Sequence, residues 1–266
     1  MPFHIYKDLS LAYDLAGAGE KALLFIHGLG GAGSAWKCQT GHFGDRFVTV
    51  TVDLFGHGRS SKEVDPIPIP RIDAEAIDSL MREKIGRPYI VIGHSFAGMV
   101  IQEMLRLADP NFKGAVFVDC THTGNNEIVE SRVSFAESML ALSAERLPEE
   151  TKRWYSELVG PSAPAEDREF ILSTLKDCDY RWLFRSVAGC REFCRKYPPG
   201  EIIVRPDFPV LVMEADNGIG GDWRKSWVNF FKDAGYYLFE DAYHFFFITE
   251  RSRFNKIMDE FLGVNF

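Results

Sequence analysis

The feature that most constrains the fold is a series of short, continuous segments of apolar or β-branched residues, separated by longer stretches with helical periodicity. In the first 120 residues these segments lie at 22–26, 48–53, 89–92 and 115–119. Such segments suit strands that are buried on both faces, as in a parallel sheet covered by helices on each side. Helices are expected between them, at about 71–85 and 96–108. The pattern predicts an α/β fold with a mostly parallel, doubly wound central sheet flanked by helices.

The pattern changes between residues 122 and 205. Strand-like segments disappear from the sequence there, and the segment favours several helices, one of which begins near Pro148 and stops at Gly160. We interpret this segment as a helical cap inserted before the late strands. The expected division is a core domain of residues 1–121 and 206–266, and a cap of residues 122–205.

The strand pattern returns after the cap. Residues 209–213 and 234–239 are the late strand candidates. From Phe254 to Leu262 the apolar residues follow helix spacing, so the chain is expected to end in an amphipathic helix packed on the sheet.

Composition excludes several classes of function. Hydrophobic residues make up 46% of the chain and charged residues 26%, which is typical of a globular protein, and the net charge of −8 argues against nucleic-acid binding. No apolar run approaches the roughly 20 residues that span a bilayer, and the N-terminus lacks the layout of a secretory signal. The five cysteines form no Cys-x-x-Cys pair, which favours free thiols in a reducing cytoplasm over a disulfide framework or a metal site.

A candidate nucleophile follows the strand at 89–92. In Gly93-His94-Ser95-Phe96-Ala97, the serine stands between a strand and a helix, and the residues two positions away on each side are very small. A sharp strand-to-helix turn that exposes a serine needs small residues at these places because the backbone is crowded. Ser95 is therefore the predicted nucleophile.

A serine hydroxyl needs a base, and the base needs a carboxylate that orients it. His244 lies in a loop after a late strand and is the predicted base. Asp216 follows the strand at 210–213 and is the predicted acid, in the chain order Ser, Asp, His. Asp119, which ends the strand at 115–119, is the alternative acid. Glu214 and Asp222 are weaker alternatives.

The oxyanion of an acyl-transfer reaction needs two backbone N–H donors. We expect them from Phe96, next to the serine, and from Leu29, in the glycine-rich loop after the first buried strand. The same loop also matches a dinucleotide fingerprint, with glycines at 28, 30 and 33 and Asp53 twenty residues further on. The set at 95, 216 and 244 favours the hydrolytic interpretation.

Together these residues resemble the α/β-hydrolase family, in its serine esterase branch with a helical cap. The His27-Gly28 turn, the Asp53-Leu-Phe-Gly-His-Gly-Arg-Ser60 stretch, the serine turn and the His244 loop occur in the family's order. The resemblance covers the whole chain and implies a cofactor-free, two-step hydrolysis through an acyl-serine intermediate. It argues against the dehalogenase and epoxide-hydrolase branches, which carry aspartate where Ser95 stands.

The resemblance leaves the acid open. Asp216-Asn-Gly-Ile219 is similar to the acid loop of plant esterases and bacterial carrier-protein methylesterases. Many relatives place the acid two residues later, where this chain has Gly218. Asp119 therefore stays an alternative.

The substrate is predicted only in outline. The cap is rich in aromatic residues, which favours an apolar pocket, and we expect Trp36, Trp154 and Trp182 to line it. The leading hypothesis is a cytoplasmic carboxylesterase that acts on small to medium apolar esters and needs no metal. A lactonase, a C–C bond hydrolase, or a receptor with little turnover would carry the same triad. A basic cluster at 181–196 also suits a methylesterase with an acidic carrier protein, which is less favoured because acidic residues dilute the cluster.

Overall fold

The computed structural model of the protein describes residues 2–62, 70–120, 126–197, 208–221, 228, 230–231 and 233–266. These residues form one eight-stranded sheet with the strand order β1-β2-β4-β3-β5-β6-β7-β8. The strands are β1 (Phe3–Tyr6), β2 (Leu9–Ala16), β3 (Ala22–Ile26), β4 (Val48–Asp53), β5 (Tyr89–His94), β6 (Phe112–Val118), β7 (Val210–Asn217) and β8 (Gly235–Tyr243). Strand β2 is antiparallel to both β1 and β4, and every other pairing is parallel, which confirms the predicted sheet.

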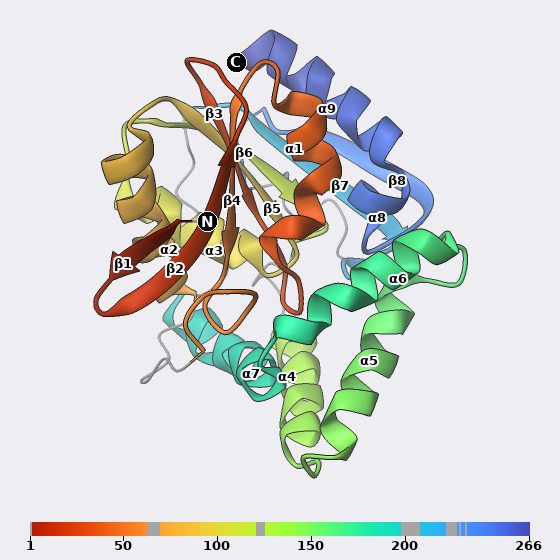
Figure 1. The fold of residues 1–266 in the computed structure, drawn as a ribbon. Helices are drawn as coiled ribbons and strands as arrows, with labels where there is room; N and C mark the ends of the chain where they lie inside the picture. The colour runs from red at the N-terminus through yellow and green to blue at the C-terminus, as the bar shows by residue number, and fades with distance from the viewer. Residues whose placement is uncertain are drawn as a thin grey trace.

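Helices cover both faces of the sheet, with α2 and α3 on one side and α1, α8 and α9 on the other (Figure 1). Two successive residues of β3 show the two layers directly, because their side chains point to opposite faces of the sheet. Leu24 packs into the core on the α2 and α3 side, and Phe25 packs into the core on the α1 and α9 side. Both residues are fully buried. The helices are α1 (Lys37–Phe43), α2 (Arg71–Leu80), α3 (Ala97–Leu107), α8 (Phe246–Thr249) and α9 (Arg251–Asn265).

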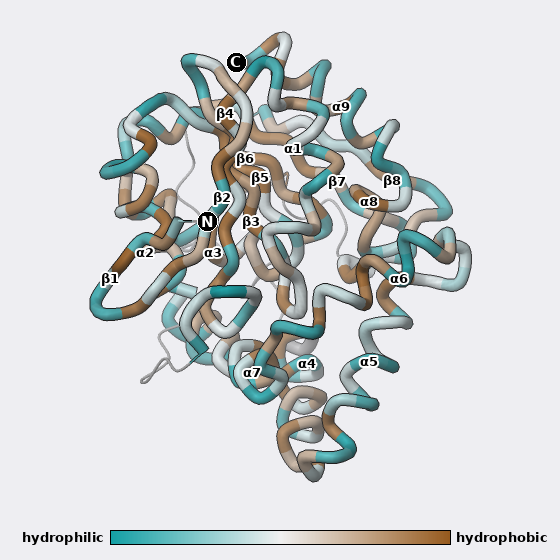
Figure 2. The backbone as a smooth tube through the Cα atoms, in the orientation of Figure 1, coloured by the Kyte–Doolittle hydropathy of each residue, from teal (hydrophilic) through white to brown (hydrophobic). Residues whose placement is uncertain are grey.

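Three short turns complete the helical layers: a 3-10 turn at Gly33–Trp36, a π-helical turn at Met81–Ile85 that extends α2, and a 3-10 turn at Thr174–Asp177. The tube in Figure 2 shows hydrophobic residues concentrated on the central strands and hydrophilic residues on the outer turns of the helices.

Within the described ranges, no helix is both long and apolar enough to cross a membrane.

A helical insertion stands between β6 and β7 and extends below the sheet in Figure 1. It consists of α4 (Asn126–Leu140), α5 (Arg146–Val159), α6 (Ala165–Ser173) and α7 (Tyr180–Lys196). We call these four helices the insertion. They agree with the helical segment expected there, and α5 begins two residues before Pro148. The expected boundaries, near residues 121–122 and 205–206, lie outside the described residues.

One buried carboxyl group on α2 is expected to make the free energy of unfolding depend on pH. Asp73, in the first turn of α2, is 2% exposed, and its Oδ1 accepts the backbone N–H of Phe55 at 3.0 Å. Burial raises the pKa of Asp73 to about 7, although the N–H of Phe55 acts against this shift. The unfolded chain ionises this group near pH 4, so the folded state loses stability as the pH rises from about 4 to 7.

We expect the substitution Asp73→Asn to remove this loss. Asparagine keeps the acceptor for Phe55 and carries no charge, so the variant should gain free energy of unfolding relative to the wild type between pH 4 and pH 8. The gain is at most about 4 kcal/mol. Urea unfolding at a series of pH values measures it.

The control for this prediction is Glu75→Gln on the same helix. Burial acts to raise the pKa of Glu75, but hydrogen bonds from Lys7, Arg71 and Tyr6 outweigh it and lower the pKa. This variant should therefore show the opposite trend: it loses stability relative to the wild type as the pH rises toward about 4, where the unfolded chain ionises this group, and keeps that deficit at higher pH. A difference between Asp73→Asn and wild type that is constant with pH would contradict the assignment.

Candidate active site

Ser95 stands at a strained turn directly after β5. Its φ is +57°, in the left-handed region that non-glycine residues seldom adopt, and its N–H donates to the carbonyl of Val118 at 3.0 Å. A Cβ on Gly93 would lie 2.6 Å from Ile101 Cδ1 and 2.9 Å from Ala97 Cβ. The first turns of α3 therefore fill the space behind the serine, and this close packing explains the small residues on both sides of it.

His244 lies in the loop after β8 and is 3% exposed. Its Nδ1 is 2.6 Å from Oδ2 of Asp119, the first residue after β6. An ionised aspartate only accepts, so Nδ1 carries a proton, and in the neutral imidazole Nε2 is then the acceptor nitrogen. Asp119 also accepts the backbone N–H groups of Ile219 at 3.0 Å and Ala215 at 3.5 Å, which fix the orientation of its carboxylate.

The expected pairing of Asp216 with His244 is wrong. Asp216 accepts the backbone N–H of Asp241 at 2.8 Å through Oδ2 and that of Ala242 at 3.0 Å through Oδ1. These amides belong to the irregular part of β8, where its register with β7 shifts. The carboxylate of Asp216 thus satisfies the backbone of an irregular strand, and Asp119, the alternative acid, contacts the histidine.

The loop after β7 is shaped to approach Asp119. A Cβ on Gly218 would lie only 2.3 Å from Oδ2 of Asp119, so a side chain at this position would displace the carboxylate. Of the weaker alternatives, Glu214 is buried within β7 and Asp222 lies outside the described residues.

His94 ties the serine turn to the histidine loop. Its Nε2 donates to the backbone carbonyl of His244 at 3.0 Å, and the two rings are 4.2 Å apart between centroids. Burial, followed by the nearby His244, lowers the pKa of His94 well below its ordinary value, so the ring stays neutral. His94 holds the backbone of His244 in place, a contact that its position in the sequence did not predict.

Two buried histidines hold the loop expected to form the oxyanion hole. His57 Nε2 accepts the N–H of Gly30 at 3.0 Å, and His27 Nε2 accepts the N–H of Leu54 at 2.9 Å. Burial lowers the pKa of His57 to about 3, so this acceptor nitrogen stays unprotonated at neutral pH.

Leu29 and Phe96, the expected oxyanion donors, lie beside the candidate nucleophile. Both residues line the cavity that contains Ser95, and neither backbone N–H makes a hydrogen bond within the part of the chain that the structure describes. A Cβ on Gly28 would lie 2.7 Å from Ser95 Cβ, so the loop passes directly against the serine. Two unused N–H groups beside a serine can stabilise a developing negative charge.

The dinucleotide interpretation of the same loop fails at Asp53. Its Oδ1 accepts the N–H of Gly33 at 2.8 Å, and its Oδ2 accepts the backbone N–H and the guanidinium of Arg59 at 3.0 and 2.8 Å. The carboxylate that would bind a ribose is thus occupied within the fold.

A cavity of about 350 Å³ lies between the sheet and the insertion. Ser95 and His244 line it together with Trp154 of α5, which agrees with the expectation for Trp154. The expectation for Trp36 and Trp182 is wrong. Trp36 is fully buried against Phe247, with ring centroids 4.3 Å apart. Trp182 is buried against the backbone of Gly56.

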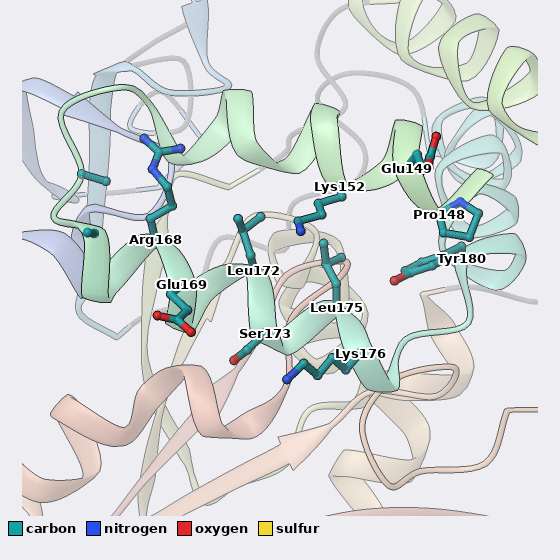
Figure 3. A pocket seen from close by; sticks show the side chains of 12 residues that line it. Pro148, Glu149, Lys152, Arg168, Glu169, Leu172, Ser173, Leu175, Lys176 and Tyr180 are labelled. Carbon is teal, nitrogen blue, oxygen red and sulfur yellow. The ribbon is translucent and has the colours of Figure 1, made fainter. Parts of the chain in front are cut away.

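A second and larger depression, of about 690 Å³, lies on the insertion itself and is drawn in Figure 3. Lys152 of α5 points toward Leu172 and Leu175 on the facing segment, and Arg168 and Glu169 lie along α6. None of the described residues lines both this depression and the cavity at Ser95, so the two are treated as separate. Among the described residues, no group of three or more histidine, cysteine or acidic side chains is placed to hold a metal ion.

A family model described as "Alpha/beta hydrolase family" matches residues 23–257. The chain belongs to the alpha/beta hydrolase family. Members of this family are hydrolases, so membership supports an enzyme of that broad class, and it confirms the fold class.

Individual relatives match more locally. The chain is 30% identical over 96 residues to the dihydrolipoyllysine-residue acetyltransferase component of an acetoin cleaving system from Cupriavidus necator, covering 36% of this chain and 25% of that protein. It is 33% identical over 84 residues to 3-oxoadipate enol-lactonase 2 from Acinetobacter baylyi, covering 29% and 32%. The matches thus span about a quarter to a third of these curated relatives.

Solved structures show the fold over the whole chain. A thermophilic esterase from Thermogutta terrifontis superimposes with a TM-score of 0.77 and 19% identity, covering 96% of this chain and 93% of that one. At this identity the likeness shows the fold alone.

The contact between Gly28 and Ser95 gives a prediction. In Gly28→Ala, the new methyl group meets Ser95 Cβ at 2.7 Å and His94 Nδ1 at 3.0 Å, so the loop must move away from the serine. We expect the rate at which a fluorophosphonate reagent labels Ser95 to fall by about tenfold or more, because small displacements of a reacting group are costly. The matched control is Gly41→Ala in α1, where a Cβ has no neighbour within 4 Å and labelling should be unchanged. Equal labelling of the two variants would show that the loop plays no part.

Proposed function

We propose that the protein is a serine carboxylesterase that hydrolyses small to medium, mainly apolar carboxylic esters through an acyl-serine intermediate. The observation that carries this proposal is the 2.6 Å contact of His244 Nδ1 with Asp119, because it leaves Nε2 available to accept a proton in the cavity that contains Ser95. The triad of the proposal is therefore Ser95, His244 and Asp119.

In the first half of the reaction, Ser95 Oγ attacks the ester carbonyl carbon and its proton passes to His244 Nε2. The carbonyl oxygen becomes an oxyanion, which accepts hydrogen bonds from the amides of Leu29 and Phe96. The tetrahedral intermediate then expels the alcohol, which takes the proton from His244, and leaves an acyl group on Ser95.

In the second half, water replaces the alcohol. His244 removes a proton from the water as it attacks the acyl carbon, and then returns the proton to Ser95 Oγ as the carboxylic acid leaves. Asp119 stays ionised in both halves, holding Nδ1–H and stabilising the imidazolium ion that forms each time.

The cavity supports an ester over a more polar substrate. Most of the described side chains that line it are apolar, including Met99, Val129, Leu158 and Val187. A cavity of this size and character suits a small or medium acyl or alcohol group.

Lactone hydrolysis is the second candidate function. A lactone is a cyclic ester, and the same triad opens it by the same two steps. The local match to an enol-lactonase supports this candidate. The carrier-protein alternative has weaker support because Arg191 of the basic cluster forms ion pairs with Glu130 and Glu137 of the insertion.

The proposal is tested by the hydrolysis of p-nitrophenyl esters from acetate to dodecanoate, with wild type and Ser95→Ala. Repeated turnover that disappears in the variant would support the esterase, and the dependence on acyl length would report the cavity. A single release of product followed by a stable adduct on Ser95 would instead indicate a receptor with little turnover. No reaction of the wild type with any ester would overturn the proposal.

The two aspartates give a second prediction. Asp119→Asn should lower kcat by about 10⁴-fold, because a neutral amide no longer holds His244 in the required tautomer. Asp216→Asn keeps one acceptor oxygen for the amides of β8 and should leave kcat within about tenfold of wild type. Steady-state hydrolysis of one ester by both folded variants decides the matter, and an active Asp119→Asn beside an inactive Asp216→Asn would reverse the assignment.

A further inference from the structure

The insertion contacts the loop that carries Leu29, one of the expected oxyanion donors. Residues 28–31 of this loop form a tight turn, in which the N–H of Gly31 donates to the carbonyl of Gly28 at 3.0 Å. Gly30 has a φ of +78°, which is the conformation that the third residue of a type II turn requires. The direction of the Leu29 amide therefore depends on what holds this turn.

The core holds the two peptide units that flank Leu29. His27 Nδ1 donates to the carbonyl of Gly28 at 2.7 Å, and His57 Nε2 accepts the N–H of Gly30 at 3.0 Å. Both histidine side chains are buried. The next peptide unit of the turn, which begins with the carbonyl of Gly30, contacts the insertion instead.

Thr174 makes this contact, from the 3-10 turn between α6 and α7. Its Oγ1 donates to the carbonyl of Gly30 at 3.0 Å, and the carbonyl of Ile171 lies 2.7 Å from the same oxygen, so both acceptors are within reach of the one hydroxyl proton. Thr174 and Gly30 are buried. Because a buried carbonyl that loses its donor is costly, the hydroxyl restrains the turn at a point that the core histidines do not reach.

Side chains of the insertion also fill the space beside Gly30. A Cβ at this position would lie 2.7 Å from Tyr155 Cε2 and 3.0 Å from Leu175 Cδ2. The Tyr155 ring packs on Phe245 as well, with ring centroids 5.1 Å apart, and Phe245 directly follows His244. The insertion thus touches the oxyanion loop and the histidine loop together.

The part of the insertion that approaches the oxyanion loop is attached to the core. The N–H of Asp179, just after the 3-10 turn, donates to the carbonyl of Gly56 at 2.9 Å. Lys62 of the core donates through Nζ to the carbonyl of Asp177 at 2.5 Å. Gly56 directly precedes His57, so the insertion is fixed beside one of the two histidines that hold the loop.

We propose that Thr174 is a positioning residue for the oxyanion hole, because its hydroxyl fixes the turn at 28–31 so that the Leu29 amide points at the developing oxyanion. Thr174 is not among the described residues that line the cavity, so it acts through the peptide of Gly30. Oxyanion stabilisation is realised in the transition state, so loss of this contact slows the chemical step more than it weakens substrate binding. The inference rests on the proposed function and adds a residue of the insertion to it.

The test removes the hydroxyl in Thr174→Val, which has nearly the same shape, and follows hydrolysis of p-nitrophenyl butanoate. We expect kcat and kcat/KM to fall together by about 5- to 30-fold, less than for the loss of a whole oxyanion donor, with KM changed by less than about threefold. Both halves of the reaction form an oxyanion, so kcat falls whichever half limits it. Thr174→Ser keeps the hydroxyl and should stay within about threefold of wild type. Thr174→Ala also lacks the hydroxyl and should repeat the loss, so the test does not depend on one variant folding.

The matched control is Thr151→Val on α5. Thr151 is fully buried, and its Oγ1 donates to the carbonyl of Leu147 at 2.6 Å within the same helix. This variant loses an equivalent hydroxyl from inside the insertion, and its kcat should stay within about twofold of wild type. An equal loss in Thr151→Val and Thr174→Val would mean that the hydroxyl only stabilises the insertion, and would overturn the inference. An unchanged kcat in Thr174→Val, or a change confined to KM, would overturn it as well.

Reversible binding of trifluoromethyl pentyl ketone provides a measurement that needs no ester hydrolysis. Ser95 Oγ forms a bond to the carbonyl carbon, its proton passes to His244 Nε2, and the electron pair of the carbonyl π bond becomes an oxyanion beside the amides of Leu29 and Phe96. Fluorine NMR spectroscopy of the adduct gives its affinity. That affinity should fall about 5- to 30-fold in Thr174→Val and stay within about twofold in Thr151→Val.

This measurement distinguishes failure of the inference from failure of the proposed function. If no ester is hydrolysed but the affinity of the adduct depends on Thr174, the inference stands and the esterase proposal fails. If esters are hydrolysed and the adduct is equally stable in wild type and Thr174→Val, the esterase stands and the inference fails. A wild type that forms no adduct would overturn the inference.

Discussion

The parallel pairing of β5 with β6 determines where the candidate active site lies in this chain. The two strands end in register, with His94 opposite Val118, so that Ser95 and Asp119 are each the next residue beyond the paired ends. Both adopt a left-handed backbone, with φ of +57° and +42°. Such conformations cost of order 1–3 kcal/mol each and persist only where the surroundings hold them.

Close backbone approaches supply that hold. Gly93, Gly28 and Gly218 each occupy a place where a Cβ would collide with the serine turn or with Asp119. Gly93 lets α3 pack behind Ser95, Gly28 brings the oxyanion loop against its front, and Gly218 brings the loop after β7 onto the carboxylate. The site is thus built by backbone segments that converge on two strained residues. The lack of a Cβ at these three glycines is as necessary for this arrangement as the side chains of Ser95 and Asp119.

This construction explains which parts were predictable from the sequence. The buried strands were predictable because burial on both faces favours continuous apolar or β-branched residues, and β3 and β4 have the expected bounds. Ser95 stood out because the crowding around it restricts its neighbours. The β1–β2 hairpin was not recognised, since edge strands do not need continuous apolar sequence, and Ile5 of β1 is 62% exposed.

The acid could not be chosen from the sequence because Asp119 and Asp216 both follow buried strands. What separates them is the irregularity of β8, whose unpaired amides take the carboxylate of Asp216. That irregularity has no signature in the local sequence. Trp36 and Trp182 were wrongly expected to line the cavity for a related reason. Aromatic content predicts that a side chain is buried, but it does not tell whether that side chain faces a core or a cavity.

The insertion and the sheet contribute different things to the cavity, yet they are connected. The sheet supplies the serine, the histidine, the aspartate that contacts it and the candidate oxyanion donors, all on loops beyond the strand ends. The insertion supplies the apolar wall and Arg132. The hydrogen bond from Arg132 to Ile219, followed by that from Ile219 to Asp119, is a direct link between the two. A substitution at residue 132 therefore also affects the loop that holds the Asp119 carboxylate. The position of the Asp119 carboxylate thus depends on the insertion through a single residue, Ile219, whose N–H and C=O make these two hydrogen bonds.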